Sequence, residues 1–367
     1  MDNLINLKNA ELKLRAKTSV FIIIYLLYIF TISFLSSDNN FIVWCDDKTI
    51  IPLIFYWIFV FSVSILNWPI LKEINNSYLK FNSKKKLVGV LITFLAFQIF
   101  NALFFSLFSY RKNIIIMDAS NVKLVINLLF SLDIILIISI VLFLFMYSKK
   151  INDLENKKII DLILICVIVN LFFISMYYVS CLRTWSTLFI MFSLTISNDT
   201  FGYLGGGHFD GHKIIKSVSP HKTWEGFFIG MISAILILSS EFSLFYLFEN
   251  KYEYFGSLLG WQFLNNQNAN EIKKIVDSNL WWIISLSFII VFSFISMIGD
   301  LSFSKFKRNL KIKDFSNMLP GQGGILDRID SSTLTLILYS LISILTNIIT
   351  NSSMLDKSFV FNKFIIK

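Results

Sequence analysis

The sequence predicts an all-α, polytopic membrane protein, and its composition and hydropathy are the two observations that predict it. Of the 367 residues, 55% are hydrophobic and 16% are charged, whereas soluble globular proteins carry about 25% charged residues. The apolar residues also form runs close to the roughly 20 residues that a helix needs to cross a bilayer. A soluble enzyme, a fibrous protein and a disordered chain are therefore excluded.

About nine helices are expected to cross the membrane, with about eight and ten as the limits. The apolar runs that predict them cover residues 18–35, 50–67, 87–109, 124–148, 159–178, 184–197, 226–248, 280–298 and 331–350. The sixth run is short, so it is expected to be tilted, broken or partly buried among other helices.

The distribution of basic residues predicts the orientation. If the N-terminus is cytoplasmic and the segments between runs alternate, most of the 33 Lys and Arg fall on the cytoplasmic side. Because cytoplasmic loops of membrane proteins are rich in Lys and Arg, the N-terminus is expected inside and the C-terminus outside. The same bias accounts for the net charge of +9, so the expected partner is the lipid bilayer and not nucleic acid.

Glycine and histidine concentrate between the sixth and seventh runs. Half of the 14 Gly lie in 198–230, where the run 205–207 is either a flexible or a tightly packed connection, because it lacks the ending of a phosphate-binding P-loop. Ser219 followed by Pro220 predicts a helix start, with Ser219 as the N-cap. Lys222 would then lie in the first helical turn, either beside a bound anion or as a lysine that extends to the membrane surface.

Aspartates and basic residues gather after the eighth run. Asp300 follows that run, whereas Asp327 and Asp330 precede the ninth and are three residues apart, on one face of a helix. Carboxylates at the ends of two membrane helices can converge on one hard cation. For a single pair, an ion pair at the membrane interface would explain the charges, but four aspartates with five basic residues favour Mg²⁺ and a polyphosphate.

These residues resemble a known family. Residues 304–330 are similar to the signature of phosphatidate cytidylyltransferases, also called CDP-diacylglycerol synthases. The matching positions are Ser304, Lys307, Arg308, Lys313, Asp314, Pro320, Gly321, Gly323, Gly324, Asp327, Arg328 and Asp330. Upstream, 198–203 resembles the Asn-Asp block of that family, and 219–226 resembles its Ser-Pro block, with His221 in place of a Lys.

The resemblance is strong over about 198–332, whereas only hydropathy supports it over 1–180. It therefore divides the chain into N-terminal transmembrane helices, 1–180, and a catalytic transmembrane region, 181–367. The second region holds two motif loops, 198–226 and 299–332, which are expected to face the cytoplasm.

The resemblance implies the reaction of CTP with phosphatidic acid to give CDP-diacylglycerol and pyrophosphate. It also implies Mg²⁺, with room for a second cation such as K⁺, and a homodimer. The implied catalytic residues are Asp300, Lys313, Asp314, Asp327 and Asp330, with Asp300, Asp327 and Asp330 as metal ligands. The implied substrate and phosphate contacts are Asn198, Asp199, Lys222, Ser304, Lys307, Arg308, Gln322, Gly323, Gly324 and Arg328.

The residues themselves suit this chemistry. The nucleophile is already an anionic phosphate, so catalysis needs positioning and charge neutralisation more than a protein base. Gln322 stands where the family usually has His, and Gly202 where it has Ala. If that His exchanges a proton, Gln322 cannot replace it, but if it only donates a hydrogen bond, Gln322 can.

Two other functions remain open at this point. One is a cytidylyltransferase that acts on another lipid phosphate, such as an isoprenoid or ether lipid. The other is a membrane transporter that uses Asp133 in the fourth run, although a transporter does not explain why polar residues gather in two cytoplasmic loops. The expected location is a bacterial plasma membrane, in preference to an endoplasmic-reticulum-type membrane.

Overall fold

The structure is a computed structural model that describes residues 2–37, 50–79, 94–96, 98–103, 156–182, 185–207, 211–248, 280–320, 322–343 and 345. Long helices dominate the described part, as the composition predicts. They are α1 (Asp2–Ser37), α3 (Ile50–Ser64), α4 (Asn67–Ile74), the π-helix η1 (Asn75–Leu79), α7 (Asn156–Leu182), α8 (Trp185–Gly206), α9 (Trp224–Phe248) and α12 (Leu280–Asn309). A further helix covers 326–343 and is called the 326–343 helix below.

Five helical stretches in the described part are long and apolar enough to cross a membrane. They are Lys17–Ser36, Leu53–Tyr78, Lys157–Ser180, Trp224–Glu241 and Ser285–Asn309. Each overlaps one predicted run. Large apolar side chains such as Phe21, Leu236 and Ile283 are exposed on these helices. Because water would make such exposure costly, this surface suits contact with lipid.

The count of nine spans remains a prediction. The run 124–148, with Asp133, and most of 87–109 lie outside the described residues. The short sixth run overlaps α8, which continues to Gly206, and the ninth run overlaps the 326–343 helix.

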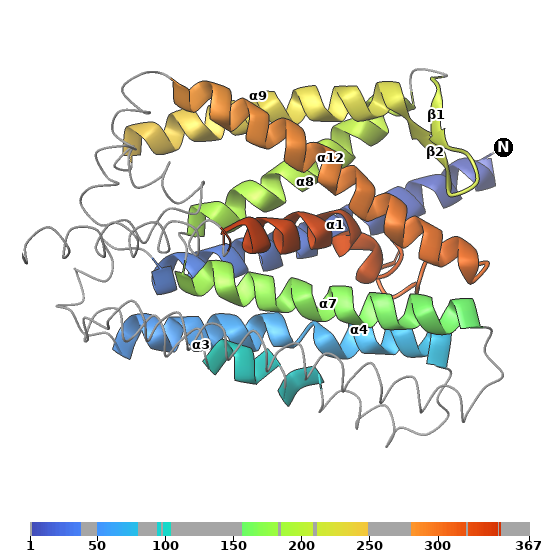
Figure 1. Cartoon of the computed structure of the whole chain (residues 1–367). Coiled ribbons are helices and arrows are strands. Elements are labelled where there is room, and N and C mark those ends of the chain that lie inside the picture. The colour runs from blue at the N-terminus through green and yellow to red at the C-terminus, as the bar shows by residue number, and fades with distance from the viewer. Residues whose placement is uncertain are drawn as a thin grey trace, which may run out of the picture.

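The helices lie side by side in a bundle (Figure 1). In that view α9 forms one side, and α3 and α4 form the opposite side. α12 runs obliquely from the side of α9 towards α7, and the 326–343 helix, drawn in red, lies in the middle. Thr333, Thr335 and Leu336 of this central helix are fully buried. The two threonines donate to carbonyl oxygens of their own helix, at 2.8 Å to Asp330 and 2.7 Å to Ser332. Buried hydroxyl groups are thereby satisfied without a partner helix.

Glycines allow α8 and α9 to pack closely. A Cβ on Gly226 would lie 2.7 Å from the carbonyl oxygen of Gly202 and 2.9 Å from the Cα of Gly206. A Cβ on Gly230 would overlap the carbonyl oxygen of Asn198. Small residues let helix backbones approach in this way. Of the two readings of the glycine run, the structure therefore shows the tightly packed one for Gly205 and Gly206.

The prediction that a helix starts at Ser219 is wrong, and with it the placement of Lys222 in a first helical turn. Residues Ser219–Thr223 form strand β2, which pairs antiparallel with β1 (Lys213–Ile215). This hairpin also shows that the chain is not purely α-helical. A two-stranded hairpin has two edges, so it tolerates the missing N–H of Pro220.

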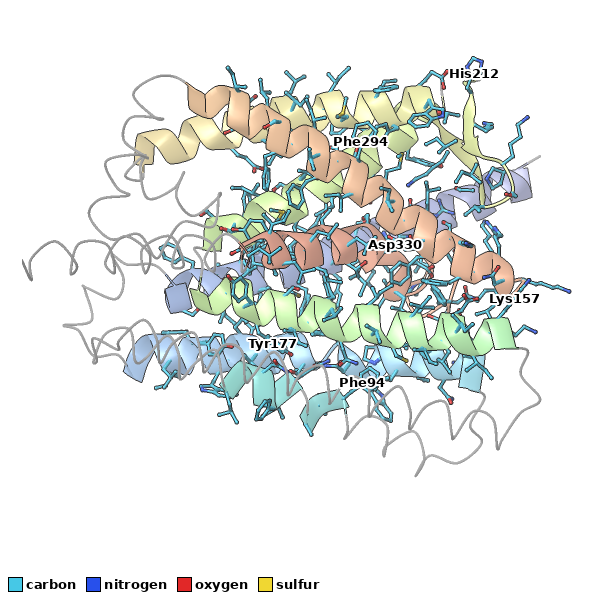
Figure 2. All side chains as sticks on the ribbon, in the orientation of Figure 1. Phe94, Lys157, Tyr177, His212, Phe294 and Asp330 are labelled. Carbon is cyan, nitrogen blue, oxygen red and sulfur yellow. The ribbon has the colours of Figure 1, made fainter. Side chains whose placement is uncertain are left out.

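The helix cap instead lies four residues later. The Thr223 hydroxyl accepts a hydrogen bond from the backbone N–H of Gly226 at 3.1 Å, as an N-cap does. α9 then begins at Trp224, whose N–H donates to the carbonyl oxygen of His212, labelled in Figure 2, at 2.9 Å. The Ser-Pro pattern does not start a helix here, because pairing in the hairpin and the threonine cap satisfy the backbone groups that a helix start would otherwise satisfy.

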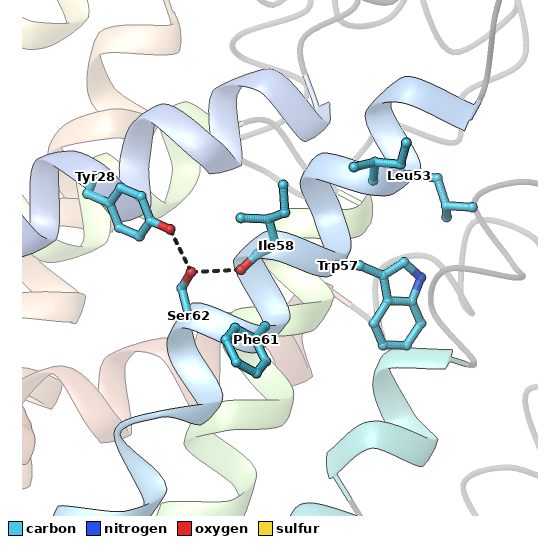
Figure 3. A pocket seen from close by; sticks show the side chains of 7 residues that line it. Tyr28, Leu53, Trp57, Ile58, Phe61 and Ser62 are labelled. Carbon is cyan, nitrogen blue, oxygen red and sulfur yellow. Dashed lines mark hydrogen bonds between the residues drawn. The ribbon is translucent and has the colours of Figure 1, made fainter.

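An apolar groove lies between α1 and α3 (Figure 3). Its volume is about 400 Å³, and its lining residues are Tyr28, Leu53, Ile54, Trp57, Ile58, Phe61 and Ser62. The Tyr28 and Ser62 hydroxyls, 3.0 Å apart, hydrogen-bond to each other. Since the groove has no charged side chain, it is not suited to hold a phosphate. The charged side chains lie in the motif segments instead.

Candidate active site at one end of the bundle

Both motif segments lie at the same end of the bundle. In Figure 1 the β1–β2 hairpin, the C-terminal end of α12 and the N-terminus of α1 are all at this end. A Cβ on Gly299 would lie 2.8 Å from the carbonyl oxygen of Asp330, so α12 and the 326–343 helix approach closely here. Ser331 of the second segment also donates a hydrogen bond to Asp199 of the first, 132 residues away in the sequence, so both segments contribute to one site.

The first ion pair of the site joins the two motif segments. Lys222 of β2 contacts the Oδ2 atom of Asp300 on α12, and both side chains are about a quarter exposed. Ser304, one turn further along α12, donates to the other oxygen of Asp300 at 3.3 Å. Lys222 thus faces a carboxylate of the second motif and does not extend away to the membrane surface.

A second lysine lies between two aspartates. The Nζ atom of Lys307 is 2.9 Å from Oδ1 of Asp327 and 4.0 Å from Oδ2 of Asp330. All three side chains are at most 10% exposed. Since an unpaired charge at this depth is costly, each side chain depends on the others for its ionised form.

Asp327 also organises the loop that precedes it. Its Oδ2 atom accepts hydrogen bonds from the backbone N–H groups of Phe315, at 3.0 Å, and Gly324, at 2.8 Å. Leu319 and Gly323 exchange backbone hydrogen bonds across the turn, and Gly323 has a φ of 89°, a conformation that favours glycine. The signature glycine at 323 is therefore required by the backbone.

Asn198 and Asp199 at the end of α8 complete the group. Asn198 is buried and donates to the carbonyl oxygen of Ser293 on α12 at 3.2 Å. Asp199 accepts a hydrogen bond from the hydroxyl of Ser331. Asp199 keeps solvent access but is surrounded by protein atoms; this crowding, then the charge of Asp300, raises its pKa to about 6.

The same cause acts more strongly on Asp330. Burial, followed by the charge of Asp300, raises the pKa of Asp330 well above its usual value, while Lys307 opposes the shift. Asp199 adds a smaller repulsion. The carboxylates of Asp199, Asp300 and Asp330 are thus close enough to repel one another. This part of the site has more carboxylates than lysines and favours an additional cation.

The ion pairs described above do not include four other predicted site residues. Arg308 donates to the carbonyl oxygens of Val218 and Ile312, at 3.0 and 3.1 Å, and so ties the hairpin to the end of α12. Lys313 and Asp314 are exposed on the loop. Arg328 turns back to donate to the carbonyl oxygen of Gln322.

Gln322 itself faces α1. Its amide nitrogen donates to the carbonyl oxygen of Arg15 at 3.0 Å and to the hydroxyl of Ser19 at 2.5 Å. Nearby, the Thr18 hydroxyl donates to the carbonyl oxygen of Pro320 at 3.5 Å. The glycine-rich turn is therefore docked on the N-terminal helix, which sequence reasoning did not link to the site.

Comparison with known proteins identifies the family. The sequence model of the cytidylyltransferase family matches residues 49–345, more than half of the chain and both motif segments. The chain belongs to the cytidylyltransferase family. The resemblance drawn from the motifs is confirmed.

Several relatives of this chain are bacterial. A protein of Rickettsia typhi named phosphatidate cytidylyltransferase is 35% identical over 149 residues, 40% of this chain and 54% of the relative. One of the same name from Haemophilus influenzae is 36% identical over 146 residues, 40% and 41% of the two chains. A Mycoplasma pneumoniae protein is 31% identical over 192 residues, 48% of each chain. The chain thus spans about half the length of the curated relatives that it matches.

Sequence reasoning missed one acidic residue that contacts the second motif segment. Glu73 on α4 is fully buried and accepts three hydrogen bonds from the second motif segment. The predicted run 50–67 ends before it, but the membrane-length stretch continues to Tyr78. An acidic residue inside an apolar helix by itself indicates a functional position. A predicted run that extended further would have included this residue.

The described residues show no preassembled metal site. Within the ranges given above, no three His, Cys, Asp or Glu side chains are arranged to hold a metal ion. The donor set is nevertheless of the right kind, because carboxylate oxygens are the ligands that Mg²⁺ prefers. Mg²⁺ is also usually held by one or two carboxylates together with substrate phosphates, and not by a cage of protein ligands.

Proposed function

We propose that the protein transfers the cytidylyl group of CTP to phosphatidic acid, with CDP-diacylglycerol and pyrophosphate as products. The observation that carries this proposal is the cluster of Lys222, Lys307, Asp300, Asp327 and Asp330 at one end of a bundle of membrane-length helices. Two lysines suit the phosphates of a nucleotide, and the adjoining apolar helices suit a lipid. The family and the names of its relatives support the same reaction.

The chemistry needs little more than positioning. A phosphate oxygen of the lipid attacks the α-phosphorus of CTP, a new P–O bond forms, and the bond to the β-phosphate breaks so that pyrophosphate leaves. No protein nucleophile is required, because the attacking group is already an anion. Lys222 and Lys307 neutralise the phosphate charge, and burial of the Lys307 side chain holds it in place.

Mg²⁺ is the cofactor of this proposal, with Asp300, Asp327 and Asp330 as the residues that would hold it. When bound, it supplies a positive charge that offsets the developing charge on the phosphates. The lysines pair with these carboxylates in the structure. They become available to the phosphates once the carboxylates have another cation.

The proposal also assigns the site to the cytoplasmic side of a bacterial plasma membrane. The site lies at the same end of the bundle as the N-terminus of α1, for which the charge distribution predicts a cytoplasmic position. CTP is available in the cytoplasm. The bacterial relatives favour the plasma membrane.

The test is an assay of the purified full chain in lipid nanodiscs with radiolabelled CTP and Mg²⁺. We expect label in lipid with phosphatidic acid as acceptor, and much less with an isoprenyl phosphate or an ether-lipid phosphate. Asp300→Asn should abolish transfer, whereas Lys305→Ala, an exposed lysine on the same helix, should not. Equal transfer to all three lipid phosphates, or none to phosphatidic acid, would contradict the proposal.

A further inference from the structure

Glu73 connects the N-terminal half of the chain to the second motif segment. Its side chain is 0% exposed. One carboxylate oxygen accepts from the Ser316 hydroxyl and from the backbone N–H of Ile325, both at 2.8 Å. The other accepts from the backbone N–H of Leu326 at 2.9 Å. All three donors lie more than 240 residues along the chain from Glu73.

The position of these donors explains why a buried carboxylate is tolerated. Ile325 and Leu326 are at the start of the 326–343 helix, where backbone N–H groups lack partners within the helix and the helix dipole is positive. A carboxylate without partners would be costly at this depth. Glu73 therefore satisfies the helix start, and the helix start in turn stabilises the charge of Glu73.

Glu73 also links the two ends of the motif loop. Ser316 lies before the glycine-rich turn, and Ile325 and Leu326 lie after it, so one carboxylate joins both sides of the loop. A Cβ on Gly324 would lie 2.8 Å from a Glu73 oxygen. Glycine at 324 is thus what allows the carboxylate to come this close.

The loop closed by Glu73 is the one that orients Asp327. The N–H of Gly324 donates to Asp327 at 2.8 Å, and Asp327 accepts from Lys307 at 2.9 Å. A contiguous set of hydrogen bonds therefore runs from Glu73 through 324–326 to the ion pair of the site. Displacing the loop by a fraction of an ångström would move Asp327 relative to Lys307.

We infer that Glu73 is a positioning residue, whose carboxylate fixes the loop 316–326 and so aims Asp327 and Lys307 at the substrates. Its hydrogen bonds come from Ser316, Ile325 and Leu326, none of which is among the residues proposed to bind phosphate. The effect on the loop stands by itself, whereas its effect on turnover rests on the proposed function. The two parts need separate measurements.

The first measurement is hydrogen–deuterium exchange on the full chain in nanodiscs. Glu73→Gln keeps the shape but removes one acceptor and turns an amide N–H₂ toward backbone donors. We expect exchange of the 315–326 amides to rise by about tenfold or more, while α9 is unchanged. The control is Glu241→Gln, the same change at a second acidic residue in a membrane-length helix, which lies outside both motif segments.

The second measurement is steady-state kinetics of cytidylyl transfer. For Glu73→Gln we expect kcat to fall by about tenfold to a hundredfold, because small misplacements at a reacting centre have effects of this size. KM for CTP should stay within about threefold, since no substrate contact is lost. Ser316→Ala, which removes one of the three hydrogen bonds, should change exchange and kcat in the same direction by less.

Unchanged exchange of 315–326 in Glu73→Gln would overturn the inference, whatever the protein catalyses. An unchanged kcat in a variant with a loosened loop would overturn the part about turnover. If Glu73→Gln does not fold, Ser316→Ala decides by the same two readouts. If the wild type transfers no cytidylyl group, the proposed function fails, and the exchange result still decides whether Glu73 fixes the loop.

Discussion

The ammonium group of Lys307 lies 2.9 Å from the carboxylate of Asp327, twenty residues further along the chain. The Lys307 side chain is 10% exposed and the Asp327 side chain 5%. The pair joins the C-terminal end of α12 to the first turn of the 326–343 helix. Asp330, 4.0 Å from the same ammonium group, adds a second carboxylate. Lys307 is therefore the charge on which two buried carboxylates depend.

Lys307→Met is expected to reduce both stability and activity. Methionine keeps the bulk but leaves Asp327 and Asp330 without their cation, and breaking a buried pair on one side typically costs about 3–5 kcal/mol. We expect a lower melting temperature in detergent and a loss of transfer of about a hundredfold or more. The matched control is Lys305→Met, two residues away on the exposed face. Wild-type stability in Lys307→Met would contradict the assignment.

The raised pKa of Asp199 predicts that the stability of the folded protein depends on pH. Its pKa in the folded protein is raised from 3.8 to about 6, so the folded state binds this proton more tightly than the unfolded state. The stabilising contribution is therefore present in acid and is lost as the pH rises through about 6. Asp199→Asn cannot ionise and should gain stability relative to the wild type between pH 4.5 and 7.5.

The check is thermal unfolding of both proteins in detergent without metal or nucleotide. The Asn side chain can still accept the hydrogen bond from Ser331, so the comparison isolates the charge. A melting-temperature difference that is equal at both pH values, or that favours the wild type more at pH 7.5, would show that Asp199 is not crowded as described.

The charged core of the site was predictable because it depends on residue type and spacing. This core consists of four charged positions on two helices, namely Asp300, Lys307, Asp327 and Asp330. A helical period places Asp327 and Asp330 on one face. Lys222 was predicted from a helix start at Ser219, which is a strand in the structure. Its contact with Asp300 nevertheless brings it to the second motif segment, and its role as a phosphate contact stays a prediction.

Contacts between distant segments were not predictable. Glu73 reaches a helix start 253 residues away, and Gln322 docks on Ser19, 303 residues before it. Neither partner carries a local pattern, because each interaction is between one side chain and a surface that exists only after folding. The β1–β2 hairpin was missed for a related reason, since its pairing competes with the local helix signal of Ser219 and Pro220.

Glycine packing between α8 and α9 predicts a large difference in stability between alanine substitutions at two glycines. In Gly230→Ala the new Cβ would overlap the backbone of Asn198. In Gly207→Ala it would lie 3.5 Å from the nearest atom, an ordinary contact. Because backbone cannot move aside as a flexible side chain can, we expect Gly230→Ala to be destabilised by about 1–3 kcal/mol and Gly207→Ala to be close to neutral. Thermal unfolding of both variants is the measurement, and equal melting temperatures would contradict the packing.

Gln322 lies at the position where the family usually has His. Its contact with Ser19 predicts how substitutions at the two positions affect transfer. In the structure the Gln322 amide donates to Ser19 and Arg15 on α1, so its role is to anchor the glycine-rich turn. Gln322→Leu removes both hydrogen bonds and should lower transfer by about tenfold, whereas Ser19→Ala removes one and should lower it less. The double variant should be no worse than Gln322→Leu alone, because both changes act on one contact.

A pH–rate profile separates anchoring from catalysis. Gln does not titrate, so no ionisation of the wild-type rate should belong to residue 322, whereas Gln322→His should add one near about pH 6.5 only if the side chain meets the substrate. The matched control on α1 is Thr31→Ala, whose hydroxyl bonds to Tyr28 of its own helix at 2.8 Å. If Ser19→Ala were silent while Gln322→Leu abolished transfer and raised KM for CTP, Gln322 would contact the phosphates and the anchoring role would be wrong. If instead Ser19→Ala and Gln322→Leu both lower kcat and leave KM unchanged, the N-terminal helix holds the glycine-rich turn in place through the Gln322 amide.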